Sequence, residues 1–154
     1  MQLYPPSQEY QPLAETIAEA TELLAAYAAE DPDIVMKLID DDFAAVPGLV
    51  LGDLSVASYP GYADKTIALS TFDNVQHESD GSVRVGSTLL ATWAGPSSGG
   101  AVTIYGHAVV DGDTGARLYR VVHYDTPVVL ANNSQFLNVI PILSFTGGYK
   151  AQTP

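Results

Sequence analysis

Apolar and polar residues alternate along much of the chain, most clearly over residues 101–124 (AVTIYGHAVVDGDTGARLYRVVHY). Val, Ile, Thr and Tyr dominate this stretch, and these residue types favour the pleated, half-buried surface of a β-sheet. The run DGDTG at residues 111–115 separates two apolar arms, which is typical of a hairpin turn. The pattern therefore predicts a long β-hairpin.

The two faces of this hairpin follow from its register. If Val110 pairs with Ala116, one face is mostly aliphatic and points into a core. Its residues on the first arm are Val102, Ile104, Gly106, Ala108 and Val110. The other face is aromatic and polar, and we expect it to point toward solvent or a partner. It consists of Thr103, Tyr105, His107 and Val109 opposite His123, Val121, Tyr119 and Arg117. The register is an assumption, because a slip of one residue would exchange the faces of one arm.

Further strands are expected over residues 34–39, 64–72, 82–93, 127–130 and 136–145. Over residues 82–93, one face carries Val83, Val85, Leu89, Ala91 and Trp93. Asp53 can cap a single helical turn, and Pro60-Gly61 marks a chain reversal.

The last strand is apolar on both faces. Leu137 and Val139 lie on one face, and Phe136 and Ile140 lie on the other. Pro141 removes a ladder donor, which predicts an edge or a bulge. A strand that is apolar on both sides needs cover on both sides, and another subunit can supply part of it.

The N-terminal region follows a different pattern. Residues 1–11 contain Tyr4, Tyr10 and two prolines and predict an extended arm. Residues 12–30 predict a helix, because Leu13, Ile17 and further apolar residues recur at spacings of three and four. The helix covers its own domain or contacts a neighbouring copy.

Together these elements predict a mainly β protein with about seven strands. We expect an antiparallel β-sandwich or jelly-roll-like domain over residues 33–154, preceded by the arm and helix over residues 1–32. A chain of 154 residues fits one such domain.

The net charge of the chain excludes some classes of binding partner. The chain carries 18 acidic and 6 basic residues, for a net charge of -12. This argues against nucleic acid and against anionic membrane surfaces, both of which attract Lys and Arg. The first basic residue is Lys37, and no apolar run is long enough to span a membrane. We therefore expect a protein made in the cytoplasm without a signal peptide.

Candidate chemistry is sparse. The chain has no cysteine and three histidines, and in the assumed register His107 and His123 lie about 13 Å apart on one face, too far for one metal ion. Three aspartates at residues 40–42 invite a calcium interpretation, but solvated charge at a strand end is the commoner case. Motifs of hydrolases, nucleotide-binding loops and zinc proteases are absent from the sequence. We expect no enzyme activity, no cofactor and no metal.

Five segments come in an order that resembles a known family. They are MKLI (36–39), VLGDLSVASYPGY (50–62), VTIYGHAVVD (102–111), TPVVLA (126–131) and LNVIP (137–141). Together they resemble the small β-sandwich virion structural proteins of tailed bacteriophages, with residues 50–62 the most specific part.

The resemblance implies a non-enzymatic component of a phage particle. The acidic charge favours the outer surface over a DNA-lined inner wall, so we expect a capsid cement or decoration protein that contacts the major capsid protein or other virion proteins. We also expect a homo-oligomer, preferably a trimer. The candidate partner-contacting residues are Tyr4, Tyr10, Leu13, Ile17, Tyr105, His107, Tyr119, Phe136 and Ile140. Alternatives are a tail, baseplate or head-fibre component and, from another class, a carbohydrate-binding module that uses Tyr105 and Tyr119.

Overall fold

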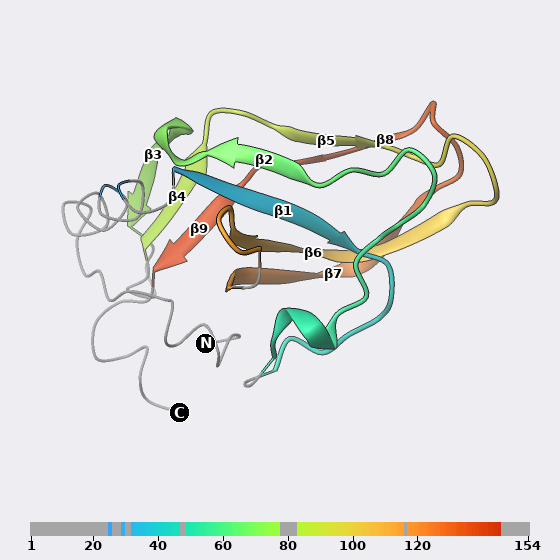
Figure 1. The fold of residues 1–154 in the computed structure, drawn as a ribbon, viewed down its shortest axis with the longest axis horizontal. Helices are drawn as coiled ribbons and strands as arrows, with labels where there is room; N and C mark the ends of the chain where they lie inside the picture. Colours follow the sequence, from blue (N-terminus) through green and yellow to red (C-terminus); the bar gives the residue numbers. More distant parts are fainter. Residues whose placement is uncertain are drawn as a thin grey trace.

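The computed structural model describes Ala25, Ala29 and residues 32–46, 49–77, 83–115 and 117–145. This part of the chain is mainly β, and its named strands pair antiparallel (Figure 1). The predicted arm and the helix over residues 12–30 lie outside the described residues except for Ala25 and Ala29, so both stay predictions. The mainly β, antiparallel character is confirmed.

The largest sheet has four strands in the order β2-β1-β6-β7. Their bounds are β1 (Asp33–Ile39), β2 (Lys65–Ala68), β6 (Val102–Asp111) and β7 (Leu118–Leu130). The strand expected at residues 34–39 is confirmed as β1. The strand expected at residues 127–130 is the end of β7.

The remaining strands form a bent ribbon with one further strand at its edge. They are β3 (Phe72–His77), β4 (Val83–Ser87), β5 (Ala91–Ala94), β8 (Phe136–Val139) and β9 (Ile142–Phe145). β4 pairs with β9 and β3, and β5 pairs with β8. Because β4 leads into β5 and β8 leads into β9, these four strands make one antiparallel ribbon that is interrupted in the middle.

The interruption explains two corrections. Gly86 pairs with Ile142 and Ala91 with Val139, so the β4–β5 side holds more residues across the bend than the β8–β9 side. The strands expected over residues 82–93 and 136–145 are therefore each divided. Pro141, predicted to lie at an edge or a bulge, lies at the break between β8 and β9, where its carbonyl accepts a hydrogen bond from the Ser87 N–H at 2.9 Å. Leu89 was expected to face inward and is instead 51% exposed.

The strand expected over residues 64–72 is also shorter than predicted. β2 ends at Ala68, and the 3₁₀ turn η2 (Leu69–Thr71) leads into β3. The Thr71 hydroxyl donates to the Ala68 carbonyl at 2.7 Å, a local bond that competes with continued strand pairing.

The central hairpin has the predicted turn but not the predicted register. The Asp111 carboxylate accepts hydrogen bonds from the Thr114 N–H, the Thr114 hydroxyl and the Arg117 N–H, which close the turn. Burial works to raise the pKa of Asp111, but these donors hold it below its usual value. Val110 pairs with Leu118, and the register shifts again between Ile104 and Gly106.

These shifts change which side chains share a face. Ile104 packs in one core cluster, whereas Ala108 and Val110 pack in another. The expectation that His107 and Val109 point toward solvent or a partner is wrong, because they are buried inside the domain, at 4% and 0% exposed. A side chain at Gly106 would place its Cβ 2.1 Å from the Val122 carbonyl oxygen, so only glycine allows this close approach.

The larger core cluster joins the four-stranded sheet to the ribbon. It takes Ile34, Met36 and Leu38 from β1, Val83 and Val85 from β4, Ala91 and Trp93 from β5 and Leu143 from β9. The smaller cluster, around Ile39, Leu49, Ala108, Val110, Leu118 and Val121, lies on the other face of β1 and β6.

Candidate interaction surface

One segment fastens the ribbon to the four-stranded sheet, and we call residues 50–64 the strap. It begins with the turn η1 (Leu51–Asp53), where the Asp53 carboxylate accepts from the Val50 N–H at 3.1 Å. Farther on, the Ala57 N–H donates to the Leu38 carbonyl at 2.8 Å, and the Asp40 N–H donates to the Ser55 carbonyl at 3.0 Å. The strap thus pairs with the same edge of β1 as β2 does, but beyond Met36, where the pairing of β1 with β2 stops.

Two tyrosines hold the end of the strap in place. At the predicted Pro60-Gly61 turn, which is confirmed, the Tyr62 N–H donates to the Tyr59 carbonyl, and Gly61 has a φ of 90°. The Tyr59 hydroxyl donates to the Ala94 carbonyl of β5 at 2.7 Å. The two rings meet edge to face, with centroids 5.3 Å apart. The strap therefore contacts β1 and β5 together.

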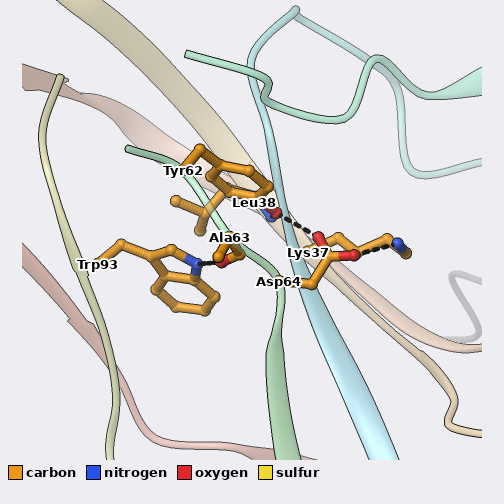
Figure 2. Close-up of polar contacts among 6 residues, drawn as sticks. All are labelled: Lys37, Leu38, Tyr62, Ala63, Asp64 and Trp93. Atoms are coloured by element: carbon orange, nitrogen blue, oxygen red, sulfur yellow. Dashed lines mark hydrogen bonds and ion pairs between the residues drawn. The ribbon is translucent and has the colours of Figure 1, made fainter. Parts of the chain in front are cut away.

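Figure 2 shows the polar contacts around Tyr62. Its hydroxyl accepts from the Leu38 N–H at 3.0 Å and donates to Asp64 Oδ1 at 2.8 Å. Lys37 Nζ bonds the other oxygen of the same carboxylate at 2.6 Å. Burial, together with the Asp64 contact, raises the pKa of Tyr62 well above its usual value.

Trp93 completes this group from β5. Its indole N–H donates to the Ala63 carbonyl at 2.9 Å, and its ring is 2% exposed (Figure 2). The polar side-chain groups of Tyr62, Asp64, Lys37 and Trp93 thus bond within this cluster. The cluster therefore stabilises the junction between β1, β5 and the strap.

The two histidines of the hairpin have different surroundings. His107 Nδ1 lies 2.8 Å from the Tyr124 hydroxyl, while its buried Nε2 has no hydrogen-bond partner among the residues that the structure describes. Burial, helped by the charge of Arg120, lowers the pKa of His107 to about 3. The imidazole is therefore neutral at physiological pH.

His123 lies at the surface. Its Nε2 is 2.8 Å from Asp42 Oδ1, and Phe43 packs edge-on against the ring at 5.0 Å between centroids. The hydrogen bond from His123 lowers the pKa of Asp42. His107 pairs with Val122 and Gly106 with His123, so the two histidines occupy neighbouring positions on opposite faces, not the same face as predicted.

The aspartates at residues 40–42 do not converge. Asp40 accepts from the Ser55 hydroxyl, Asp41 accepts from the Asp42 N–H, and Asp42 contacts His123. Within the described ranges, no three His, Cys, Asp or Glu side chains lie close enough to hold a metal ion.

The predicted partner-contacting residues fall into three groups. Tyr4, Tyr10, Leu13 and Ile17 lie outside the described residues. Tyr105 and Tyr119 are half-buried, and His107 is buried. Phe136 and Ile140 are exposed.

The two hairpin tyrosines, Tyr105 and Tyr119, occupy different irregularities of the β6–β7 pair and so do not form one common surface. Tyr119 packs against the larger core cluster, and the Arg117 guanidinium carbon lies 5.7 Å from its ring centroid. Tyr119 sits at the register shift beside Val109 and Val110, whereas Tyr105 sits at the other shift, near Ile104.

Phe136 and Ile140 belong to an exposed surface on the two-stranded sheet, which we call the outer face of β5–β8. Leu137 and Val139 turn inward and pack on the core, so Phe136, Asn138 and Ile140 point outward. Leu90 precedes Ala91, the partner of Val139, so it lies beside Ile140 at the bend; Leu90 and its neighbour Leu89 are both exposed. Sequence reasoning missed both leucines because it assumed one unbroken strand; Leu89 and Leu90 side by side, which cannot both face inward in a strand, were the available signal.

Comparisons with known protein families, curated proteins and solved structures find no match to this chain. Among the described residues, no helix has both the length and the apolar character needed to cross a membrane.

Proposed function

We propose that this chain is a non-enzymatic structural component of a tailed-phage virion, and specifically a cement or decoration protein on the outer surface of the head. We further propose that its sheets are the two layers of a β-sandwich of jelly-roll type. The larger core cluster supports the layered arrangement, because it combines side chains from the four-stranded sheet with side chains from the ribbon.

The observation that carries the functional proposal is the outer face of β5–β8. Leu89, Leu90, Phe136 and Ile140 are 51–60% exposed on a chain whose net charge is -12. Contiguous exposed apolar surface on a soluble domain typically marks a contact with another protein. A shell protein that meets its neighbours repeatedly needs such a surface, whereas the acidic remainder keeps the free chain dispersed.

The strap supports the fold part of the proposal. Residues 50–62 carry the most specific resemblance to small phage virion proteins, and their side chains have structural roles here. Asp53 closes η1, Tyr59 bonds β5, Gly61 supplies the left-handed turn residue, and Tyr62 bonds β1. These contacts join β1 to β5 in this chain.

The proposed partners are the major capsid protein and further copies of this chain. Packaged DNA is a polyanion, and an acidic chain is repelled from the inner wall of the head. An outer position avoids this repulsion.

The test is the copy number of this chain in purified particles, measured by quantitative mass spectrometry against the major capsid protein. A simple ratio to the capsid protein, with hundreds of copies, is the expected result. A few to a few tens of copies would instead make the chain a tail, baseplate or head-fibre component. Absence from the particles would overturn the virion proposal and return attention to the carbohydrate-binding module.

A further inference from the structure

Along the outer face of β5–β8, apolar residues lie at both ends and polar residues lie in the middle. At one end, Phe136 pairs with Ala94; in the middle, Asn138 pairs with Thr92. At the other end, Leu90 precedes Ala91 and Ile140 follows Val139, and Ala91 and Val139 are themselves paired. The face is therefore apolar at both ends and polar at its waist, where the Thr92 hydroxyl donates to Asn138 Oδ1 at 2.8 Å.

The bend in the ribbon produces one of these apolar ends. Between the pairs Gly86–Ile142 and Ala91–Val139, residues 87–90 lie opposite residues 140–141, so two surplus residues form a protrusion at which Leu89 and Leu90 are exposed. Burying both leucines inside the domain would require the β4–β5 side and the β8–β9 side to have equal numbers of residues across the bend. The protrusion is thus a consequence of the local register.

The two strands that carry this face lie in stretches of the chain without charged side chains. No Asp, Glu, Lys or Arg occurs from residue 85 to 110 or from residue 126 to 149, and these two stretches supply β5 and β8. The acidic side chains are therefore carried by other elements. Two copies of a chain with a net charge of -12 repel each other, and the repulsion is weakest where neither copy contributes a carboxylate.

We propose that the outer face of β5–β8 binds the same face of a second copy of this chain across a two-fold axis through the Thr92–Asn138 pair. The inference rests on the proposed multi-copy structural role and identifies the surface through which copies meet. It replaces the trimer expected from the sequence with pairing between two copies at this contact.

The layout of the face argues for a second copy as the occupant. A two-fold rotation about the waist puts Phe136 of one copy against the Leu90 and Ile140 end of the other, and the reverse. The same rotation places polar waist on polar waist, where the Asn138 N–H₂ group, which makes no hydrogen bond within the described residues, can donate to its symmetry mate. A partner without this symmetry would not need two apolar ends around a polar centre.

The test is the mass of the purified full chain, measured by sedimentation equilibrium over a range of concentrations without any particle present. A dimer is expected. Phe136→Glu should weaken self-association by roughly tenfold or more, because it puts a charge into an apolar contact. Asn138→Asp is nearly isosteric and should also weaken it, because it puts two carboxylates near the axis.

Val46→Glu is the matched control. Val46 is also exposed and apolar, but it lies in the loop between β1 and η1 and belongs to neither β5 nor β8. This variant should leave the dimer intact. Circular dichroism checks that each variant is folded.

A monomeric parent chain, a trimer, or a dimer unaffected by both Phe136→Glu and Asn138→Asp would overturn the proposed contact. These outcomes leave the virion role untouched, because that role is measured by copy number in particles. Conversely, a chain absent from particles that still forms a Phe136-dependent dimer would refute the virion role and keep the self-contact.

Discussion

Trp93 and Phe136 are large aromatic residues on opposite faces of the same two-stranded sheet. Trp93, on β5, is 2% exposed and bonds the strap through its indole N–H. Phe136, on β8, is 60% exposed. The inner face of β5–β8 is thus committed to the fold and the outer face is available to a partner, although both are apolar. Hydrophobicity alone does not tell these two uses apart; the strap that covers one face does.

The largest effect should come from the inner face. Trp93→Ala removes a fully buried ring and the bond to the Ala63 carbonyl, so it should lower the free energy of unfolding by about 3–5 kcal/mol. Urea unfolding followed by circular dichroism measures this loss.

Thr92→Ala, one residue away on the outer face, is the matched control for Trp93→Ala. It loses only an exposed bond to Asn138 and should cost less than about 1 kcal/mol. Equal losses in the two variants would mean that the two faces do not differ as described.

Much of the inner face could be predicted from the sequence. Alternation identified Val83, Val85, Ala91 and Trp93 as one face, and all four are buried. The register could not be predicted, because it depends on the shifts between Ile104 and Gly106 and between Val109 and Val110, and on the extra residues at the bend between β4 and β5. Gly106, for example, must approach the Val122 carbonyl oxygen, and a single glycine in the sequence does not specify which backbone it will approach.

The candidate partner-contacting residues were only half predictable. Phe136 and Ile140 follow from a strand that is apolar on both sides, and they are exposed. Tyr119 and His107 were placed on a partner surface by the assumed register, and the observed register shifts bury His107 and pack Tyr119 against the core. A period of two identifies residues that share a face only as far as the next bulge.

The strap should be sensitive to the loss of a single hydroxyl. Tyr62→Phe removes the acceptor for the Leu38 N–H and the donor to Asp64, and it should cost about 1–3 kcal/mol because it leaves a β1 N–H without its partner. Thermal unfolding of the purified chain measures the loss.

Tyr105→Phe is the matched control for the strap. Tyr105 is half-buried, and its hydroxyl makes no hydrogen bond within the described part of the chain, so its removal should change the unfolding free energy by less than about 0.5 kcal/mol. If Tyr62→Phe also changed the unfolding free energy by less than about 0.5 kcal/mol, the strap would not hold the two layers together.

A smaller effect should come from His107, which is buried on the core side of β6. The unfolded chain binds a proton on this histidine near its usual pKa of 6.5, whereas the folded chain does so only near a pKa of about 3. Its contribution to stability is therefore complete above the unfolded value and declines as the pH falls below it. Between pH 8 and pH 6 the wild-type chain should lose about 1 kcal/mol through this residue.

His107→Gln should lack this part of the pH dependence, since glutamine does not titrate. Urea unfolding of both chains at the two pH values gives the comparison, and carboxylates such as Asp111 cancel because they titrate in both chains. Identical pH dependence in the two chains would mean that water reaches the His107 ring in the folded state.

The smallest effect on the isolated fold should come from the outer face. Phe136→Ala should change the unfolding free energy of the dilute chain by less than about 0.5 kcal/mol, because the ring is already in water. Leu137→Ala, the next residue along β8, should cost about 2 kcal/mol or more, because that side chain packs on the core. At high concentration the order of importance should change: dimerisation through the outer face stabilises the folded state by mass action, so the wild-type melting temperature should rise with concentration. The melting temperature of Phe136→Ala should not rise, and a wild-type value independent of concentration would show that the outer face has no partner in a second copy.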